Sequence, residues 1–194
     1  EKKEFWSKFF HITKDTLIPR PETELMVDKL IKNYKNKKNI SILDMGTGSG
    51  CIIISLLSEL HNSYGIGIDI SQKAIEIAKK NAISNGVSSR IKFLNISFSR
   101  YFNKKYDLIV SNPPYISRRE FQCLSEDIKR FEPRIALDGG NDGLDLIKKV
   151  IYKAKEILKL NGTLALEIGN KQFKKVSKIL FNNNFKIESR INDF

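Results

Sequence analysis

The stretch Tyr106-Asp107-Leu108-Ile109-Val110-Ser111-Asn112-Pro113-Pro114-Tyr115 guides the interpretation of the whole chain. Its first half is a short apolar run, which predicts a buried strand. The two prolines end that strand at once, because proline has no N–H to give to a sheet ladder. A rigid elbow, defined as residues 112–115, therefore follows the strand. Open α/β sheets bind their ligands at this carboxyl edge.

The elbow offers two hydrogen-bond acceptors and an aromatic ring. Asn112 has a side-chain carbonyl, Pro113 a main-chain carbonyl, and Tyr115 a flat ring. Two convergent acceptors and a ring suit a planar NH2 group, such as that of an amide or an amino-base. The alternative is a tight turn that merely follows a strand.

A glycine-rich turn lies upstream of the elbow. Residues 40–44 predict a strand, and Met45-Gly46-Thr47-Gly48-Ser49-Gly50 joins it to a helix that ends near Leu60. Glycines at such a turn let a ligand approach the backbone closely. The spacing is G-x-G-x-G and not the G-x-G-x-x-G of dinucleotide folds. An ordinary strand–helix turn and a nucleotide fold both remain open.

The second predicted strand, residues 65–69, ends in an acid. The carboxylate of Asp69 can accept both hydrogen bonds of a ribose diol. The alternative is a capping role at the start of the next helix, where Ser71 is the expected N-cap and Gly86 the expected end. The glycine turn one βα unit upstream favours the ribose role.

Alternating strands and helices predict an α/β fold with a doubly wound, mostly parallel sheet. An aromatic alternation over residues 5–10 fits a short hairpin, and a helix is expected from Pro21 to about Tyr34. A long polar connection, residues 116–142, follows the elbow and suggests a wall or lid on the substrate side. The remaining predicted strands are 91–94, 106–110, 163–168 and 185–187, and the remaining helices are 144–159 and 171–182.

Composition narrows the class of protein. The 194 residues suffice for one domain with a substantial core. The net charge of +12 has two explanations of about equal weight. One is contact with nucleic acid, such as tRNA. The other is simple compositional bias, because the lysines are spread through the helices. Cys51 and Cys123 have no metal-type spacing and the chain has two histidines, so we expect no metal site. We expect both thiols to be reduced, as in a cytoplasmic protein. The apolar runs are too short to span a bilayer, and no signal peptide is recognisable, so no membrane association is expected.

Four stretches in register resemble the class I S-adenosylmethionine-dependent methyltransferases and, among them, the release-factor glutamine methyltransferases. Residues 44–50 are similar to the cofactor loop and residues 112–115 to the catalytic N-P-P-Y. That pair also resembles DNA adenine methyltransferases and several RNA methyltransferases. Residues 17–24 and 132–140 are similar to stretches of the glutamine subfamily itself. The resemblance runs from about Phe5 to the end and implies a Rossmann-like class I methyltransferase fold.

The resemblance also implies an activity. A methyl group would pass from S-adenosyl-L-methionine to the side-chain amide nitrogen of the glutamine in the Gly-Gly-Gln motif of peptide chain release factors, leaving S-adenosyl-L-homocysteine and using no metal. A nucleic-acid exocyclic-amine methyltransferase, acting on DNA adenine or RNA, is the alternative, and a non-catalytic cofactor-binding module is a third reading. A monomer with a release factor as its partner is expected.

The resemblance assigns roles to two groups of residues. Those expected to bind the cofactor are Asp44, Met45, Gly46, Thr47, Gly48, Asp69, Phe98 and Asn112. Those expected to act in catalysis are Asn112, Pro113 and Tyr115, and Pro114 joins them in binding the substrate.

The chain also departs from the family pattern. Relatives commonly carry a helical N-terminal domain that holds the release factor, so residues 1–20 are expected to be an aromatic hairpin with a linker remnant before a methyltransferase domain at 21–194. The last strand of the sheet would lie past Phe194. Where the family commonly has an acid and an aromatic residue beside the adenine, this chain has Ser97-Phe98. Stacking of Phe98 on the adenine is expected, with core packing as the alternative.

Overall fold

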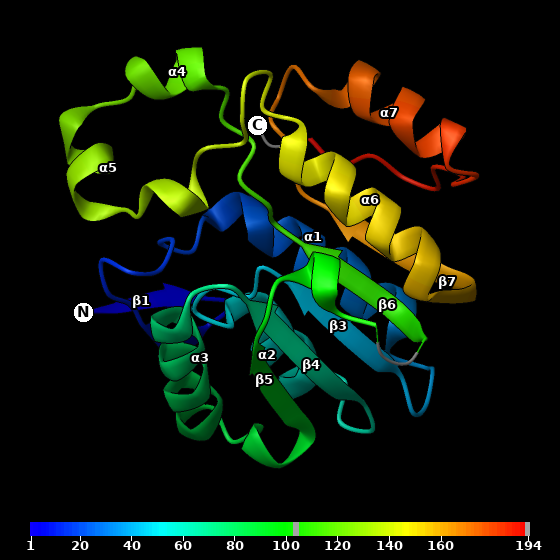
Figure 1. The fold of residues 1–194 in the computed structure, drawn as a ribbon. Coiled ribbons are helices and arrows are strands. Elements are labelled where there is room, and N and C mark those ends of the chain that lie inside the picture. The colour runs from blue at the N-terminus through cyan, green and yellow to red at the C-terminus, as the bar shows by residue number, and fades with distance from the viewer. Residues whose placement is uncertain (103–104, 193–194) are drawn as a thin grey trace.

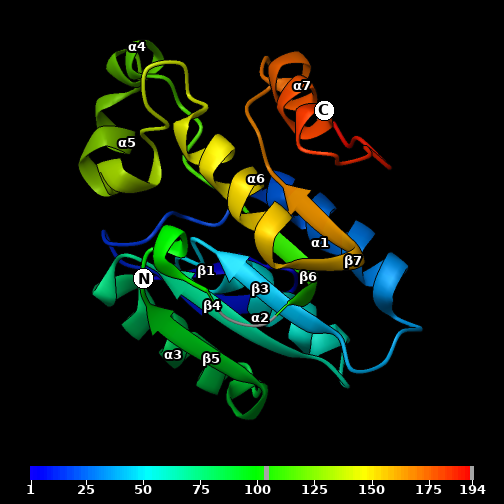
Figure 2. The same ribbon diagram turned by 45° about the vertical axis from the view of Figure 1, so that its right-hand side comes forward.

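The computed structural model describes residues 1–102 and 105–192. Five strands form one sheet in the order β5-β4-β3-β6-β7, and each neighbouring pair is parallel. Figure 2 shows the arrowheads of β3, β4, β5 and β7 pointing the same way. The strands are β3 Ser41–Met45, β4 Tyr64–Asp69, β5 Ile91–Asn95, β6 Tyr106–Ser111 and β7 Leu158–Leu166.

Helices cover both faces of the sheet, which confirms the predicted doubly wound fold (Figure 1). Alternate residues of a strand point to opposite faces. Ile42 therefore packs with Val27 of α1 in one core, whereas Leu43 packs with Val150 of α6 in the other. The helices are α1 Pro21–Tyr34, α2 Cys51–Glu59, α3 Gln72–Ser84, α6 Asp145–Ile157 and α7 Phe173–Asn182, with short 3-10 turns η1 Ser88–Arg90 and η2 Phe98–Arg100.

The predicted N-terminal hairpin is confirmed. Its antiparallel strands are β1 Lys2–Phe5 and β2 Lys8–His11. Trp6 and Ser7 make the turn with φ of 53° and 54°, the conformation that a two-residue hairpin favours. Phe5 and Phe10 are fully buried in the core shared by α1 and α2, so burial of these two rings fixes the hairpin on the domain.

The long connection after the elbow contains three short helical elements, α4 Arg118–Gln122, α5 Glu126–Phe131 and η3 Arg134–Ala136. We call residues 116–143 the insertion. Its ends pair with each other, because the N–H of Ile116 donates to Leu137 O at 3.1 Å and the N–H of Gly139 to Ile116 O at 2.8 Å. The insertion thus leaves the elbow and returns to it, and α4 and α5 project from the sheet in both ribbon views (Figures 1 and 2).

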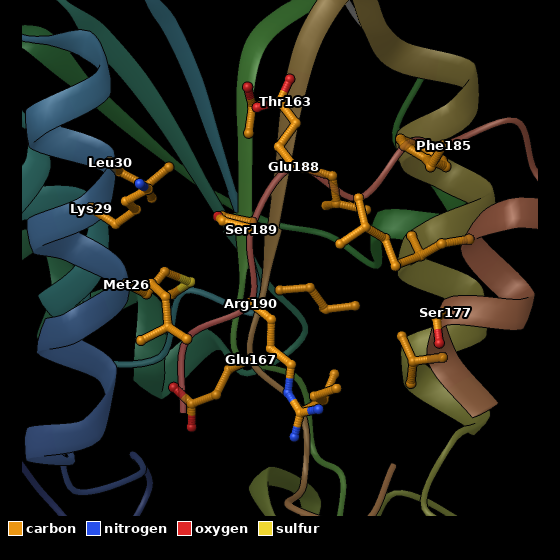
Figure 3. A pocket seen from close by; sticks show the side chains of 18 of the residues that line it. Met26, Lys29, Leu30, Thr163, Glu167, Ser177, Phe185, Glu188, Ser189 and Arg190 are labelled. Atoms are coloured by element: carbon orange, nitrogen blue, oxygen red, sulfur yellow. The ribbon is translucent and has the colours of Figure 1, made fainter. Parts of the chain in front are cut away.

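The prediction of a strand at residues 185–187 is wrong. These residues lie beyond the edge strand β7 and form no ladder with any described strand. A cavity of about 1190 Å³, lined by α1, β7, α7 and residues 185–192, occupies the space along the edge of β7 (Figure 3). A β-propensity run becomes a strand only where a neighbouring strand accepts its backbone hydrogen bonds.

Candidate functional site

The sheet brings the predicted site residues to one edge. Asp44 is paired in register with Gly67 of β4 and with Val110 of β6, so the two strands flank β3; Asp69 ends β4 and Asn112 follows β6. Phe98 comes after β5, and Glu167 follows β7. Across the carboxyl edge the order is therefore Phe98, Asp69, Asp44, Asn112 and Glu167. With neighbouring strands about 4.8 Å apart, β5 and β6 are separated by roughly 14 Å, the reach of an extended small molecule.

The glycine turn presents bare backbone beside Asp44. Gly46 and Gly48 adopt φ of 77° and 54°, which favours glycine. A Cβ added to either would meet nothing within 4 Å, so open space adjoins the turn. The N–H groups of Gly46 and Thr47 donate to Ile68 O at 2.9 and 3.0 Å and hold the turn against β4.

Asp44 has one oxygen satisfied and one free. Its side chain is buried, and Oδ2 accepts a hydrogen bond from Thr47 Oγ1 at 2.7 Å. Oδ1 is also buried and has no hydrogen-bond partner in the described residues. Burial raises the pKa of this carboxyl to about 7. A buried acceptor without a donor costs free energy, which a donor group bound beside the glycine turn would recover.

Asp69 makes the contacts expected of the capping role considered for it, and it also holds the glycine turn. Its Oδ2 accepts the Gly48 N–H at 2.9 Å and its Oδ1 accepts the Ser71 N–H at 2.8 Å. The carboxylate therefore braces both the glycine turn and the start of α3, where Ser71 Oγ caps Ala74 N at 3.2 Å as predicted. Burial raises the pKa of Asp69. Each oxygen keeps a further lone pair for a ligand hydroxyl.

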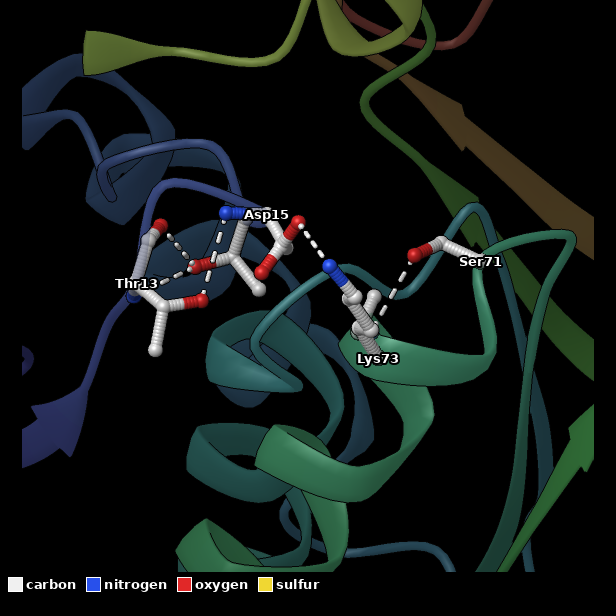
Figure 4. Close-up of polar contacts among 6 residues, drawn as sticks. Thr13, Asp15, Ser71 and Lys73 are labelled. Carbon is white, nitrogen blue, oxygen red and sulfur yellow. Dashed lines mark hydrogen bonds and ion pairs between the residues drawn. The ribbon is translucent and has the colours of Figure 1, made fainter.

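The loop that follows the hairpin is attached to α3. Lys73 Nζ of α3 lies 3.2 Å from Asp15 Oδ1 (Figure 4). The loop itself is a tight turn, in which Thr16 N donates to Thr13 O at 3.0 Å and Asp15 N donates to Thr13 Oγ1 at 3.2 Å. These contacts place residues 13–16 against the first turn of α3.

Two predicted cofactor residues are held by the protein core. The Met45 side chain is buried, which leaves its backbone for any ligand contact. Phe98 is partly buried and packs against the core cluster that contains Leu43 and Met45. The hydroxyl of Ser97 forms a hydrogen bond with that of Ser99 at 2.8 Å. Core packing, the alternative considered for Phe98, thus accounts for part of its surface.

Three hydrogen bonds hold the elbow and the end of the strand before it in place. Ser111 Oγ donates to Met45 O at 2.7 Å and ties the end of β6 to β3. Pro113 is buried, whereas Asn112 and Tyr115 keep part of their surface exposed. Gln172 Nε2 donates to Tyr115 O at 2.9 Å, and the Tyr115 hydroxyl donates to Glu167 Oε1 at 3.3 Å. Burial raises the pKa of Tyr115, so the phenol stays protonated.

Sequence reasoning missed Glu167 and Thr23 as members of this site. Thr23 Oγ1 of α1 donates to Glu167 Oε2 at 2.6 Å, and Asn112 Nδ2 lies 3.4 Å from Thr23 Oγ1 as a donor. Burial raises the pKa of Glu167. A signal existed, because Glu167 is an acid at the carboxyl end of a strand, the same feature that identified Asp69.

The stretches at 17–24 and 132–140 contact each other, and the second also contacts the elbow. Arg20 Nη2 lies 2.5 Å from Glu132 Oε1, and the Ile18 N–H donates to Glu132 Oε2 at 3.4 Å. The Glu132 side chain is almost fully buried. A Cβ on Gly139 would lie 2.8 Å from Pro114 O, so a glycine is needed where the insertion returns to the elbow.

The large cavity beyond β7 is distinct from the glycine turn. Tyr115 is the one predicted site residue among its lining residues, and Glu167 stands at the same wall (Figure 3). Asp44, Asp69 and Asn112 do not line it. Among residues 1–102 and 105–192, no helix is long and apolar enough to cross a membrane, and no group of three or more His, Cys, Asp or Glu side chains is arranged to hold a metal ion.

Two family models match the chain. The methyltransferase small domain matches residues 21–129, and the Eco57I restriction-modification methylase matches residues 80–194. Among solved structures, the ribosomal protein L11 methylase of Lactobacillus delbrueckii subsp. bulgaricus has a TM-score of 0.68 at 21% identity, over 90% of this chain and 75% of that one. The hMettl16 catalytic domain in complex with a 3′UTR hairpin has a TM-score of 0.70 at 18% identity, over 90% of this chain and 66% of that one. These likenesses show the fold.

A third structure, a SAM-dependent methyltransferase from Geobacter sulfurreducens in complex with S-adenosyl-L-homocysteine, has a TM-score of 0.53 at 20% identity, over 80% of this chain and 50% of that one.

Curated relatives are closer in sequence. A release factor glutamine methyltransferase of Fusobacterium nucleatum subsp. nucleatum is 44% identical over 98% of this chain, which spans about half, 54%, of that relative. Another, of Agrobacterium fabrum, is 38% identical over 99% of this chain and 68% of its own length. With the glycine turn, the elbow and both subfamily stretches at one sheet edge, the chain belongs to the release factor glutamine methyltransferase family.

Proposed function

We propose that the protein transfers a methyl group from S-adenosyl-L-methionine to the side-chain amide nitrogen of the glutamine in the Gly-Gly-Gln motif of peptide chain release factors. Family membership supports the reaction class. The observation that carries the proposal is the Arg20–Glu132 ion pair, because it joins the two subfamily stretches, and the second of them returns to the elbow at Gly139.

The residues around the glycine turn fit the proposed cofactor. The unpaired Asp44 Oδ1 would accept from the cofactor's amino group, and the open space at Gly46 and Gly48 admits a ligand against the backbone. Asp69 retains lone pairs for a ribose diol. When bound, the cofactor supplies a sulfonium-activated methyl group. Phe98 is proposed to contact the adenine with the part of its ring that the core leaves uncovered.

The elbow would orient the acceptor amide. An amide nitrogen is a weak nucleophile, since its lone pair is delocalised into the carbonyl. Asn112 Oδ1 and Pro113 O would accept its two N–H bonds and stabilise the positive charge that develops on nitrogen as the S–CH3 bond breaks and the N–CH3 bond forms. One of the two nitrogen protons would then leave to solvent after methyl transfer. Tyr115 would cover the amide plane, and Pro114 keeps the elbow rigid.

A nucleic-acid exocyclic-amine methyltransferase is the second candidate, favoured by the match to the Eco57I restriction-modification methylase model over residues 80–194. The insertion argues against it. Residues 116–143 contain five basic and six acidic side chains. A segment beside the elbow with almost no net charge is poorly suited to bind a phosphate backbone, because such binding depends on an excess of basic side chains.

The test is methyl transfer from labelled cofactor to a purified release factor and to the same factor with its Gly-Gly-Gln glutamine replaced by alanine. Label on the first and none on the second is expected, located by peptide mass mapping. Asn112→Ala should reduce transfer at least about 100-fold while cofactor affinity stays within about threefold, because Asn112 acts on the acceptor. Equal labelling of both factors, or an unimpaired Asn112→Ala variant, would overturn the proposal.

A further inference from the structure

The side chains of Thr23 and Glu167 form a chain of hydrogen bonds that ends on Asn112. Thr23 Oγ1 donates to Glu167 Oε2 at 2.6 Å, and Asn112 Nδ2 donates to Thr23 Oγ1 at 3.4 Å. The Tyr115 hydroxyl donates to the other carboxylate oxygen, Oε1, at 3.3 Å. Three elements thus converge on the elbow: α1 supplies Thr23, β7 leads into Glu167, and β6 leads into the elbow.

The direction of these bonds follows from the chemistry of the groups. An ionised carboxylate only accepts hydrogen bonds, so Glu167 takes the single proton of the Thr23 hydroxyl. The Thr23 oxygen can then only accept from its other neighbour. Of the two ends of the Asn112 amide, only the NH2 group can donate to it, so the amide oxygen faces the other way.

We propose that Thr23 and Glu167 are positioning residues that fix which end of the Asn112 amide faces the methyl acceptor. The inference rests on the proposed function for the identity of the acceptor, a planar NH2 group. With Oδ1 directed at the acceptor, Asn112 accepts an N–H bond. With the amide turned over, its NH2 group would oppose the acceptor's NH2 group, donor against donor.

The lengths of the two hydrogen bonds indicate how strongly each one contributes to the orientation of Asn112. The Asn112–Thr23 contact of 3.4 Å is long for a hydrogen bond, so it selects an orientation more than it adds stability. The Thr23–Glu167 bond is short and charge-assisted, and Thr23 is buried at 2% exposure. Loss of the carboxylate charge therefore removes the cause of the orientation, while the surrounding packing stays in place.

Glu167→Gln tests this directly, because the glutamine amide can donate to Thr23 and reverse the chain of bonds. We expect kcat for methyl transfer to fall about 100-fold, with the Kd for S-adenosyl-L-homocysteine unchanged within about twofold. Thr23→Val should lower kcat about tenfold, and Thr23→Ser, which keeps the hydroxyl, should restore it to within about threefold. The double variant Thr23→Val with Glu167→Gln should be no slower than Glu167→Gln alone, because the two residues act as one unit.

A second readout does not depend on turnover. The NMR signal of the Asn112 side-chain NH2 is assigned through its loss in Asn112→Ala. We expect the protons of this group to exchange with solvent more slowly in the wild-type protein than in Thr23→Val and Glu167→Gln. The exchange rate in Thr23→Ser should match that of the wild type. Equal exchange in all four, or kcat of Glu167→Gln within twofold of wild type in folded protein, would overturn the inference. If the wild type labels no release factor, the proposed function fails, and the exchange rates still decide the orientation of Asn112.

Discussion

Asp44 is an acidic side chain held inside the protein, where burial changes its protonation. Its carboxyl is buried, one oxygen has no partner in the described residues, and burial raises its pKa from 3.8 to about 7. The folded protein therefore holds a proton on Asp44 between about pH 4 and pH 7, where the unfolded chain has released it. Because the native state binds more protons in this window, the contribution of Asp44 to stability is present below pH 4 and is lost as the pH rises to 7.

This linkage predicts how cofactor affinity depends on pH. A ligand with a cationic amino group needs ionised Asp44, so the affinity for S-adenosyl-L-homocysteine should rise about tenfold per pH unit up to about pH 7 and then level off. Titration calorimetry from pH 5.5 to 8 measures this. Asp44→Asn, which cannot ionise, should bind more weakly at pH 8 and show no such slope. The same slope in both proteins would contradict the assignment of Asp44.

At the scale of residues, the parts of the site that depend on local chemistry could be predicted from the sequence. The glycine turn and the elbow were recognisable because proline, glycine and a strand-end acid act over a few positions. Glu167 and Thr23 lie 144 residues apart in the chain and meet only in the folded sheet. The order of strands brings them together, and no local pattern encodes their hydrogen bond.

Among the elements, the hairpin is held by the burial of Phe5 and Phe10 and also by a buried amide of α3. Asn81 of α3 is fully buried, and its Oδ1 accepts the His11 N–H at 2.7 Å. Its Nδ2 donates to His11 O at 3.0 Å and to Ser49 O at 2.8 Å. Asn81 thus links β2, α3 and the glycine turn, and no local pattern in the sequence indicates this role.

We predict that Asn81→Ala lowers the free energy of unfolding by about 2–4 kcal/mol, because it leaves three backbone groups without a partner in the interior. Asn85→Ala is the matched control. Asn85 lies one turn later, at the C-cap of α3, and donates to Phe9 O at 3.3 Å on the same hairpin, but this contact is exposed to solvent. Its removal should cost less than about 1 kcal/mol. Urea unfolding of both variants compares the two, and similar losses would refute the role of Asn81.

The elements also show where pattern reasoning fails. The helix from Pro21 to Tyr34, the N-cap at Ser71 and the hairpin were predicted from local signals, and all three form. The strand at 185–187 was predicted from the alternation of strands and helices, and among the described residues it has no neighbouring strand with which to pair. A helix satisfies its own backbone, whereas a strand depends on another segment.

For the whole molecule, the distribution of charge favours methylation of a release factor over methylation of a nucleic acid. Of the net +12, helices α6 and α7 carry seven lysines and two acids. The insertion, which starts and ends at the elbow, is nearly neutral and exposes Phe131 and Ile135. Exposed apolar side chains on the insertion suit contact with a protein surface better than contact with a polyanion.

The most direct test offers the wild-type protein labelled cofactor together with equal amounts of a release factor, unmethylated duplex DNA and bulk tRNA in one reaction. Separation of the three and mass mapping of the labelled product identify the acceptor. We predict that the methyl group is found on the Gly-Gly-Gln glutamine of the release factor and that Asn112→Ala abolishes this labelling. Label on nucleic-acid amines, with the release factor unmodified, would contradict the account.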